Sequence, residues 1–335
     1  MGVVAKEEAE RIADPHMRAA LLEGVDLNHF CGACCHVGYM GIVVGKHTHC
    51  TGDAAYLWDK EHKCLLPQAC LCACPLAKAR RGEAHGEVPI REFGPGLSAH
   101  AAWRTTTGLS RESNEDAVAA LAGPGWLAVA VFDGMGGVQA GEVASALAAE
   151  TVRERLSRAT WSSTYAFKVW LAETIAEANR RVYDFAMKSP NGHKGMGTTL
   201  TLAVAWAGVL GIAHVGDSRC YLLRGGELRQ LTDDHTMTAA LAAAGKTPEE
   251  IADSGWDEHT LVQAVGPERE VAADVLIEPL RAGDVVVLTT DGVHGVVTIV
   301  ANGTPAAVCR SVIDATYAAG APDNATVIVM KVEGV

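Results

Sequence analysis

The chain has 335 residues, 49% of them hydrophobic and 20% charged, a composition typical of a soluble globular protein and not of a disordered one. Its formal net charge of −12 argues against a nucleic-acid-binding protein, whose contact surface would be basic. The first residues lack the apolar run of a signal peptide, and the most apolar run, residues 200–215, is short for a membrane span. We therefore expect a cytoplasmic protein with no nucleic-acid or membrane partner.

The first hundred residues differ in composition from the rest of the chain. They contain eight of the ten cysteines and eight of the thirteen histidines. In a cytoplasmic protein this density indicates metal binding rather than disulfides. We predict a Cys/His-rich accessory domain over residues 1–97 and a second domain over residues 98–335, with the boundary in the Gly/Pro-containing stretch 92–100.

Within residues 1–97, the Cys31-x-x-Cys34 spacing suits one half of a tetrahedral Zn²⁺ site. The other half is less defined, because ligands spaced as in Cys70-x-Cys72-x-Cys74 are closer than usual. An iron–sulfur cluster and buried, unligated cysteines are the alternatives. Residues 1–97 resemble no family by their motifs, and we interpret them as a module that docks a partner or senses redox state. The candidate zinc ligands are Cys31, Cys34, Cys50, Cys70, Cys72 and Cys74.

After residue 100, short apolar runs alternate with alanine-rich stretches. The apolar runs predict buried strands at 125–134, 284–292 and 326–332. Apolar residues at helical spacing predict two consecutive helices, at 139–159 and 164–188, stacked on one face of a sheet.

Hairpins are predicted later in the chain. Residues 198–206 and 209–215 form one hairpin, and Gly225-Gly226 marks the two-residue turn of the next. Residues 236–266 interrupt the strands as a helical excursion with Gly and Pro breaks. Helices followed by hairpins favour an α+β fold over a regular βαβ repeat.

Three of the predicted strands carry an aspartate at one end. Asp133 and Asp291 each precede a glycine, and Asp323 introduces the last strand. A single Asp-Gly pair is most often just a tight turn. If the three strands lie side by side, however, their ends bring three carboxylates to one rim of the sheet. Crowded carboxylates require a divalent cation, and oxygen ligands suit Mg²⁺ or Mn²⁺.

A charged segment, "RESNED" (111–116), lies before the first of these strands. Arg111 offers a guanidinium that can clamp two phosphate oxygens, and Glu115 and Asp116 can hold metal-bound waters. Asp217 ends a further strand just before a polar turn. Taken alone, the segment is also compatible with a solvated charged loop.

Seven motifs occur in an order that resembles the bacterial branch of the PP2C-type, metal-dependent Ser/Thr protein phosphatases. The resemblance covers about residues 98–335. It implies a four-layer α-β-β-α sandwich, with two antiparallel sheets flanked by helices. It also implies a Mn²⁺ or Mg²⁺ pair whose bridging water attacks phosphorus in line, as two-metal chemistry requires. The motifs are "RxxNED", "DGMGG…GE", "GTTL", "VGDSRxYLLRxG", "LTxDHT", "TTDGV" and "PDNATVIV".

The resemblance assigns roles to individual residues. Asp133 would bridge the two metals, with the Gly134 carbonyl as a further ligand, and Asp291 and Asp323 would complete one metal's shell.

The charged segment takes the remaining roles. Glu115 and Asp116 would bind the second metal, partly through water, and Arg111 would hold the substrate phosphate. Asp217 corresponds to the aspartate of a third, weaker metal site.

The sequence departs from the family pattern at two positions. Met135 stands where eukaryotic members have a histidine proposed as general acid, so water or another group would protonate the leaving oxygen. Gly295 replaces the second aspartate of "DGxxD", which puts the third metal in doubt. His294 beside it could compensate, although we interpret it as a surface-loop histidine.

In the family, the helical excursion at 236–266 corresponds to a flap that borders the active site. Trp256 and His259 could touch a phosphopeptide there, although ordinary packing explains Trp256 more simply.

The function predicted from the sequence is metal-dependent hydrolysis of phosphoserine and phosphothreonine. The expected partners are phosphoprotein substrates, including a bacterial-type Ser/Thr kinase or its targets. Two alternatives remain: a phosphoprotein-binding scaffold without turnover, and a redox sensor in which the cysteine-rich region controls the phosphatase.

Overall fold

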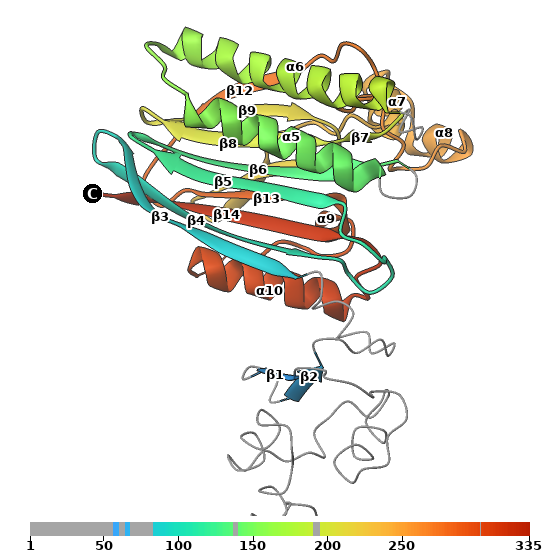
Figure 1. Ribbon diagram of the computed structural model, residues 1–335, viewed down its shortest axis with the longest axis horizontal. Coiled ribbons are helices and arrows are strands. Elements are labelled where there is room, and N and C mark those ends of the chain that lie inside the picture. Colours follow the sequence, from blue (N-terminus) through green and yellow to red (C-terminus); the bar gives the residue numbers. More distant parts are fainter. Residues whose placement is uncertain (1–55, 60–63, 68–82, 137–139, 190–194, 302) are drawn as a thin grey trace, which may run out of the picture. The chain divides into compact units, whose positions relative to one another are not determined.

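The computed structural model describes residues 56–59, 64–67, 83–136, 140–189, 195–301 and 303–335 (Figure 1). The chain divides into two compact units, Met1–Arg81 and Gly82–Val335. In the first unit, β1 (Tyr56–Asp59) and β2 (Cys64–Pro67) pair as an antiparallel two-stranded sheet. The six candidate zinc ligands lie outside the described residues, so the zinc site stays a prediction.

The second unit contains two antiparallel sheets of six strands each (Figure 1). The first sheet has the order β11 (Glu227–Gln230), β10 (Arg219–Arg224), β13 (Val285–Thr289), β14 (Ala325–Gly334), β4 (Leu97–Thr106) and β3 (Ala84–Gly94). The second has the order β12 (Asp274–Pro279), β9 (Val209–Val215), β8 (Leu200–Trp206), β6 (Trp126–Met135) and β5 (Asp116–Gly123), and β7 (Gly197–Thr198) pairs with the end of β6.

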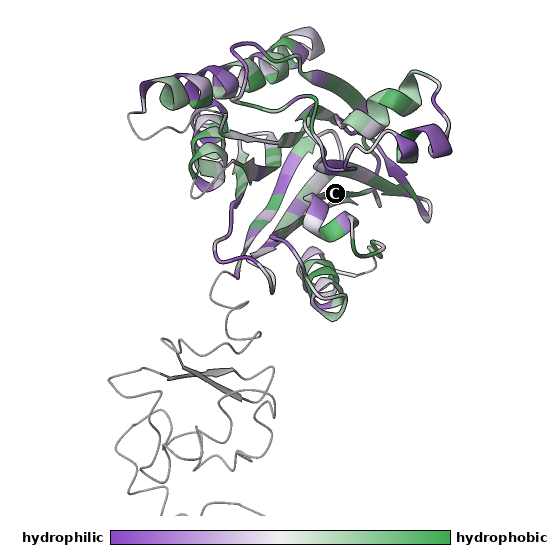
Figure 2. Ribbon diagram, turned by 90° about the vertical axis from the view of Figure 1, so that its right-hand side faces the viewer, coloured by the Kyte–Doolittle hydropathy of each residue, from purple (hydrophilic) through white to green (hydrophobic). Residues whose placement is uncertain are grey.

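Helices cover the outer faces of both sheets. Helices α5 (Ala140–Ser157) and α6 (Thr164–Lys188) pack on the second sheet, and α10 (Pro305–Ala318) packs on the first. Viewed end-on, these helices lie outside the two sheets (Figure 2). The α+β class and the α-β-β-α layering implied by the resemblance are therefore confirmed for this unit.

The position of strand β6 in the fold explains why its middle residues are all apolar. Its side chains point alternately to the two faces of the sheet, as in any strand. Val129 and Val131 pack into the core between the sheets, whereas Ala130 and Phe132 pack against the helices. Because both faces are covered, no position in the middle of the strand is left for a polar residue.

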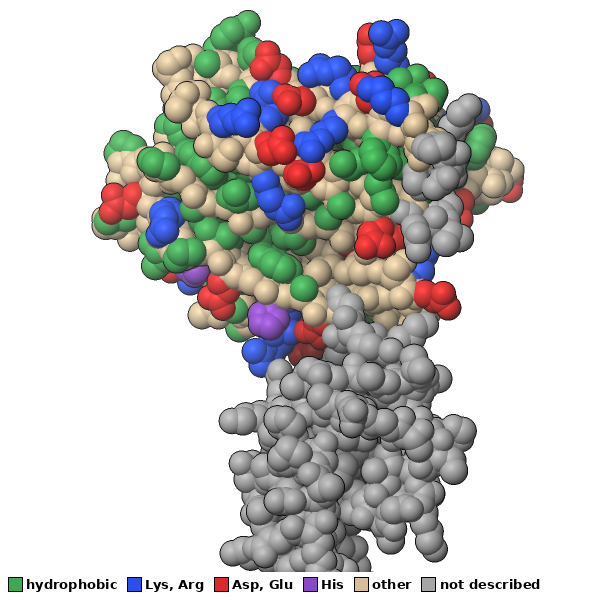
Figure 3. Space-filling view, viewed as in Figure 1, with side chains coloured by type: hydrophobic (Ala, Val, Ile, Leu, Met, Phe, Trp, Pro, Cys, Tyr) green, Lys and Arg blue, Asp and Glu red, His purple; other side chains and the backbone are tan. Residues whose placement is uncertain are grey.

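The predicted helices and hairpins are confirmed, with small shifts at their ends. The helix predicted at 139–159 is α5, and the helix predicted at 164–188 has the bounds of α6. Gly225 (φ +61°) and Gly226 (φ +89°) close the β10–β11 turn in the left-handed region. Charged side chains of both signs are interspersed over the face shown in Figure 3. Between α5 and α6, Arg155 pairs with Glu177 at 2.5 Å.

The second unit begins earlier than the predicted boundary between residues 97 and 98. Strand β3 pairs with β4 in the first sheet, and Gly96 (φ +67°) lies in the turn between them. The Gly/Pro stretch that suggests a linker is thus a hairpin turn. Strand β3 is an edge strand with mostly exposed side chains, so its sequence lacks the apolar pattern of a buried strand.

The excursion at 236–266 contains two short helices, α7 (Met237–Ala243) and α8 (Pro248–Asp253). Neither helix has a buried residue, although each has a threonine N-cap. We call residues 236–266 the flap; its helices lie at the same end of the sandwich as α9 (Asp291–His294) (Figure 1). No helix among the described residues is long and apolar enough to cross a membrane.

Candidate metal centre and phosphate site

A cavity of about 610 Å³ opens at this end of the sandwich, and both sheets contribute to it. Strand β6 of the second sheet supplies Asp133, whereas Asp291 and Asp323 lie beside β13 and β14 of the first. The three carboxylates therefore do not share the rim of one sheet, as the sequence suggested. They meet where the ends of two packed sheets converge. The predicted site residues that line the cavity are Arg111, Glu115, Asp133, Gly134, Asp217, Asp291 and Asp323.

Asp133 is fixed by its backbone. Its N–H donates to Thr199 Oγ1 at 2.9 Å, and its carbonyl accepts from the Thr199 N–H at 2.8 Å. Burial raises the pKa of the Asp133 carboxyl well above its ordinary value, and the charges of Asp116 and Asp291 raise it further. A carboxylate in this position needs a cation to remain ionised.

Asp116 is not among the residues that line the cavity. It pairs with Asp133 across β5 and β6, and its Oδ2 accepts hydrogen bonds from Thr290 (2.9 Å) and Thr326 (2.5 Å). Burial raises its pKa to about 7, and its Oδ1 is buried without a hydrogen-bond partner among the described residues. Of the two acidic neighbours in "RESNED", only Glu115 reaches the cavity directly.

Arg111 forms an ion pair with Asp323, and both residues line the cavity. Its Nη2 lies 2.6 Å from Asp323 Oδ2, and this hydrogen bond raises the pKa of the guanidinium. The Arg111 side chain is 54% exposed, so it remains accessible to an anion from solvent. Arginine and carboxylates therefore face the same space.

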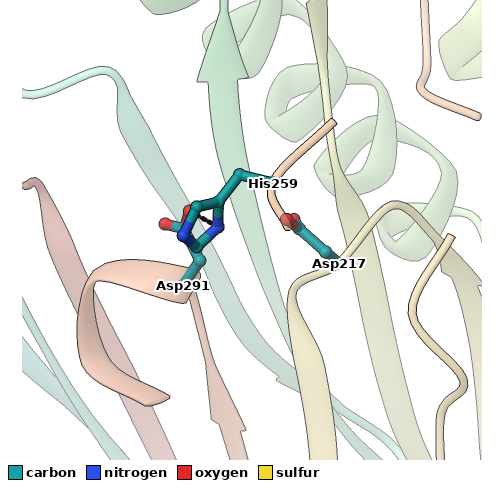
Figure 4. Close-up of side chains that lie close together, drawn as sticks. All are labelled: Asp217, His259 and Asp291. Atoms are coloured by element: carbon teal, nitrogen blue, oxygen red, sulfur yellow. Dashed lines mark ion pairs between the residues drawn. The ribbon is translucent and has the colours of Figure 1, made fainter. Parts of the chain in front are cut away.

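The flap contributes His259 to the same cavity (Figure 4). Its Nδ1 lies 3.2 Å from Asp291 Oδ2, and this hydrogen bond raises the pKa of His259 to about 9. Burial alone would raise the pKa of Asp291, but hydrogen bonds from His259 and Asp133 hold it below its ordinary value. Burial raises the pKa of Asp217 to about 7, and one ligand atom each of Asp217, His259 and Asp291 lies within 4.8 Å of the others.

The protein phosphatase 2C family model matches residues 109–322, which include every residue lining this cavity except Asp323 and Asn324. The chain belongs to the protein phosphatase 2C family. Its relatives include the serine/threonine phosphatase stp of Listeria monocytogenes, 37% identical over 59% of this chain and 79% of that one. The serine/threonine protein phosphatase PstP of Mycobacterium tuberculosis is 35% identical over 68% of this chain and 44% of that one.

Solved structures agree with this assignment. The catalytic domain of PstP, in complex with two manganese ions, is 34% identical and superposes with a TM-score of 0.61. That match covers 71% of this chain and 99% of the PstP chain. The protein phosphatase 2C resemblance inferred from the motifs is thus confirmed.

The cavity of this protein phosphatase 2C chain fits hard divalent cations. Its convergent donors are carboxylate oxygens, which suit Mn²⁺ and Mg²⁺. The backbone at Gly134 is also close-packed: a Cβ there would lie 2.3 Å from the Gly141 carbonyl oxygen and 2.6 Å from that of Glu115. Only glycine lets this strand end reach the cavity.

The two departures from the family pattern have different surroundings. Met135 and Gly295 both line the cavity, and where the pattern has a polar side chain Met135 presents an apolar one and Gly295 presents none. His294 is half-buried at the end of α9, where its Nδ1 lies 2.9 Å from Thr289 Oγ1, and burial lowers its pKa to about 4. His294 does not line the cavity, so it does not fill the place of the missing aspartate at Gly295. Because it is half-buried at the end of a helix, the surface-loop interpretation of His294 was also wrong.

Sequence reasoning missed the residues that position the carboxylates. Asn324 accepts from the Glu115 N–H at 2.8 Å and donates to the carbonyls of Thr107 and Ser113. Thr199 fixes Asp133, as described above. Both residues belong to quoted motifs, "GTTL" and "PDNATVIV", but an isolated Thr or Asn carries no signal for such a role.

Proposed function

We propose that this protein hydrolyses phosphoserine and phosphothreonine esters in phosphoproteins, with Mn²⁺ or Mg²⁺ as cofactor. The observation that carries the proposal is the cavity in which Arg111 faces a group of convergent carboxylates. Carboxylates that must stay ionised favour cations, and the arginine favours an anion. A phosphate ester between them satisfies both requirements.

The proposed ligands of the metal pair are Asp133, the Gly134 carbonyl, Asp291 and Asp323, with Glu115 and Asp116 on the second ion. Asp116 would act through water, because it does not line the cavity. When bound, the ions would supply Lewis acidity that acidifies water and neutralises phosphoryl oxygens. Asp217 is the proposed ligand of a third, weaker site.

Arg111 is the proposed phosphate ligand. Its fork of N–H donors matches phosphate oxygens, and its side chain is exposed enough to turn from Asp323 to a substrate. Metal binding at Asp323 would remove the present partner of Arg111. The guanidinium would then be free to hold the phosphate in line for attack.

The class of substrate is proposed from the relatives, which are named as bacterial serine/threonine phosphatases. We propose that the substrates are phosphoproteins of a bacterial-type Ser/Thr kinase pathway. The zinc-binding or partner-docking role of residues 1–97 stays a prediction from the sequence.

The proposal is tested by hydrolysis of p-nitrophenyl phosphate and of a phosphoserine peptide with and without Mn²⁺. Asp133→Ala and Asp291→Asn should each lower kcat by at least about a thousandfold, since each removes a proposed metal ligand. Asp184→Asn is the matched control, because Asp184 lies on α6 and, among the described residues, pairs only with Lys188 at 3.5 Å. Activity that survives both site changes would refute the proposed centre.

The second candidate is a scaffold that binds phosphoproteins without turnover, which Gly295 favours by removing a polar group from the cavity. A Mn²⁺ titration monitored by both calorimetry and product release separates the two. Metal and phosphopeptide binding without product would identify the scaffold.

A further inference from the structure

We propose that the protein binds a transition-metal ion, with Zn²⁺ as the favoured ion, between Asp217, Asp291 and the imidazole of His259. In this site His259 takes the place of the aspartate that is missing at Gly295. The inference rests on the proposed function, because it specifies the ligands and the ion of the third site named there. Of the two flap residues singled out by the sequence, Trp256 is 51% exposed, so ordinary packing does not explain it, whereas His259 lines the carboxylate cavity.

Three donor atoms from three parts of the chain converge in the cavity (Figure 4). One ligand atom each of Asp217, His259 and Asp291 lies within 4.8 Å of the other two. His259 Nδ1 and Asp291 Oδ2 are 3.2 Å apart. An ion bonded at about 2.0–2.2 Å holds its ligand atoms about 3–4 Å apart, so small side-chain rotations are enough to close the site.

The backbone beside Asp217 holds this carboxylate in a fixed position. Gly216 has φ +110°, and a Cβ there would lie 2.6 Å from Thr199 Cβ. The His235 N–H donates to the Gly216 carbonyl at 2.8 Å. Asp217 itself is only 6% exposed. A buried carboxylate is costly unless it is paired or coordinates a metal, so the surroundings of Asp217 favour a bound cation.

His259 is also positioned by hydrogen bonds, although it belongs to the flap. Its N–H donates to Asp257 Oδ1 at 2.8 Å, and the carbonyl of the next residue, Thr260, accepts from the Met237 N–H at 2.8 Å. The His259 side chain is 52% exposed, so an ion can reach it from solvent. The imidazole is therefore presented to the cavity by a hydrogen-bonded segment and not by a free end.

Gly295 explains why a histidine is needed here. The Gly295 N–H donates to the Asp291 carbonyl at 2.8 Å, so position 295 lies one helical turn after Asp291, and Gly295 offers no donor atom to the cavity. Its neighbour His294 is bonded to Thr289 instead. Among the described residues that line the cavity, His259 alone carries an imidazole.

The donor set identifies the kind of ion. The proposed ligands of the metal pair are all oxygen atoms, which suit Mg²⁺ and Mn²⁺. Two carboxylates and one imidazole suit Zn²⁺ better, because Zn²⁺ accepts nitrogen ligands readily and is often held by three protein ligands with water in the fourth position. The third site should therefore prefer Zn²⁺ to Mg²⁺, unlike the pair beside it.

The test uses the full-length protein with ¹⁵N-labelled histidines in excess Mg²⁺, with free Zn²⁺ set by a metal buffer. The imidazole resonances of His259, identified by their loss in His259→Gln, should shift when Zn²⁺ is added. In Asp217→Asn the same shift should need at least about ten times more free Zn²⁺, since even the loss of an outer partner of a metal ligand lowers affinity by that factor. The resonances of His100, which lies on β4 and pairs with Glu333 at 3.9 Å, should stay in place and show that each variant is folded.

A second measurement counts the bound ions. In equilibrium dialysis at the same free Zn²⁺, the wild type should bind one more Zn²⁺ per chain than His259→Gln. Ions held by other parts of the chain cancel in this difference. His100→Gln is the matched control and should bind as many ions as the wild type. His259→Asp replaces the nitrogen donor by oxygen and should lower the preference of the site for Zn²⁺ over Mg²⁺.

His259 resonances that do not respond to Zn²⁺, or that respond at the same free Zn²⁺ in Asp217→Asn, would overturn the site. Equal numbers of bound Zn²⁺ in the wild type and in His259→Gln would also overturn it. Zn²⁺ binding at His259 in a protein that hydrolyses no phosphate ester with Mn²⁺ would support the site and refute the proposed phosphatase function.

Discussion

Thr326 donates a hydrogen bond to Asp116 across the two sheets, with 2.5 Å between Thr326 Oγ1 and Asp116 Oδ2. Thr326 lies on β14 of the first sheet, and Asp116 begins β5 of the second. Thr290 donates to the same oxygen from the end of β13. The Asp116 carboxylate therefore fastens the ends of the two sheets together.

Thr326→Val should destabilise the protein by about 1–3 kcal/mol, because it removes a hydrogen bond from a buried carboxylate while keeping the side-chain volume. Urea unfolding at pH 8 measures the loss. Thr316→Val is the control, since the Thr316 hydroxyl is buried but, within the described part of the chain, bonds only to the Val312 carbonyl of its own helix. Equal losses of stability in the two variants would show that the cross-sheet hydrogen bond stabilises the protein no more than a hydrogen bond within one helix.

The metal-free protein should become less stable as the pH rises from about 4 to about 7. The folded-state pKa of Asp116 is raised to about 7, and that of Asp133 is also raised, so the folded state holds more protons than the unfolded state in this window. The contribution of these carboxyl groups to stability is complete at pH values below their pKa in the unfolded state. It is lost as the pH rises through their pKa in the folded state. Chemical unfolding in EDTA at a series of pH values measures this loss.

Mn²⁺ should reverse that loss, and should do so more at pH 8 than at pH 5, because cations favour the ionised carboxylates. At a hundredfold excess over its Kd, a bound ion stabilises by about 2.7 kcal/mol. Asp116→Asn removes one of the titrating groups and should flatten the metal-free pH profile. A profile that stays as steep in this variant would contradict the role given to Asp116.

Gly134→Ala should destabilise the protein by about 3 kcal/mol, since the new Cβ would overlap backbone oxygens that cannot move independently. It should also lose Mn²⁺-dependent turnover. Gly96→Ala is the comparison: Gly96 has φ +67° but open space around it, so only the backbone strain of about 1–2 kcal/mol is expected. Full Mn²⁺-dependent activity in Gly134→Ala would contradict the close-packing argument.

His259→Gln should loosen the flap, because the contact with Asp291 joins the flap to α9. Amide hydrogen exchange in α7 and α8 should become about two- to fivefold faster, as expected for a half-exposed ion pair. His100→Gln is the control, since His100 lies on β4 and pairs with Glu333 at 3.9 Å. Unchanged exchange in the flap would show that Asp291 does not hold it.

The sequence predicts those parts of the protein whose pattern is local. Strand β6, helices α5 and α6 and both hairpins follow from apolar spacing and glycine turns, and the ordered motifs indicate the family. The sequence did not predict strand β3, because an edge strand with exposed side chains needs no apolar pattern. The convergence of Asp133 with Asp291 depends on how two sheets stack, which no spacing along the chain records.

Side-chain roles that depend on a distant partner were hardest to predict. Asp116 is the immediate neighbour of Glu115, yet β5 turns it inward onto Thr290 and Thr326. Trp256 is a typical core residue by type, but the flap offers it no core. In both cases the surroundings of the side chain, and not its identity, decide the outcome.

The absence of buried residues in α7 and α8 has an evolutionary consequence. Substitutions there change no packed interior, so their cost in folding free energy should be small, within about 0.5 kcal/mol for most surface positions. The carboxylate centre has no such latitude, because its residues hold two sheets together. Descendants of this chain can therefore acquire new substrates by drift in the flap while the chemistry beneath it stays fixed.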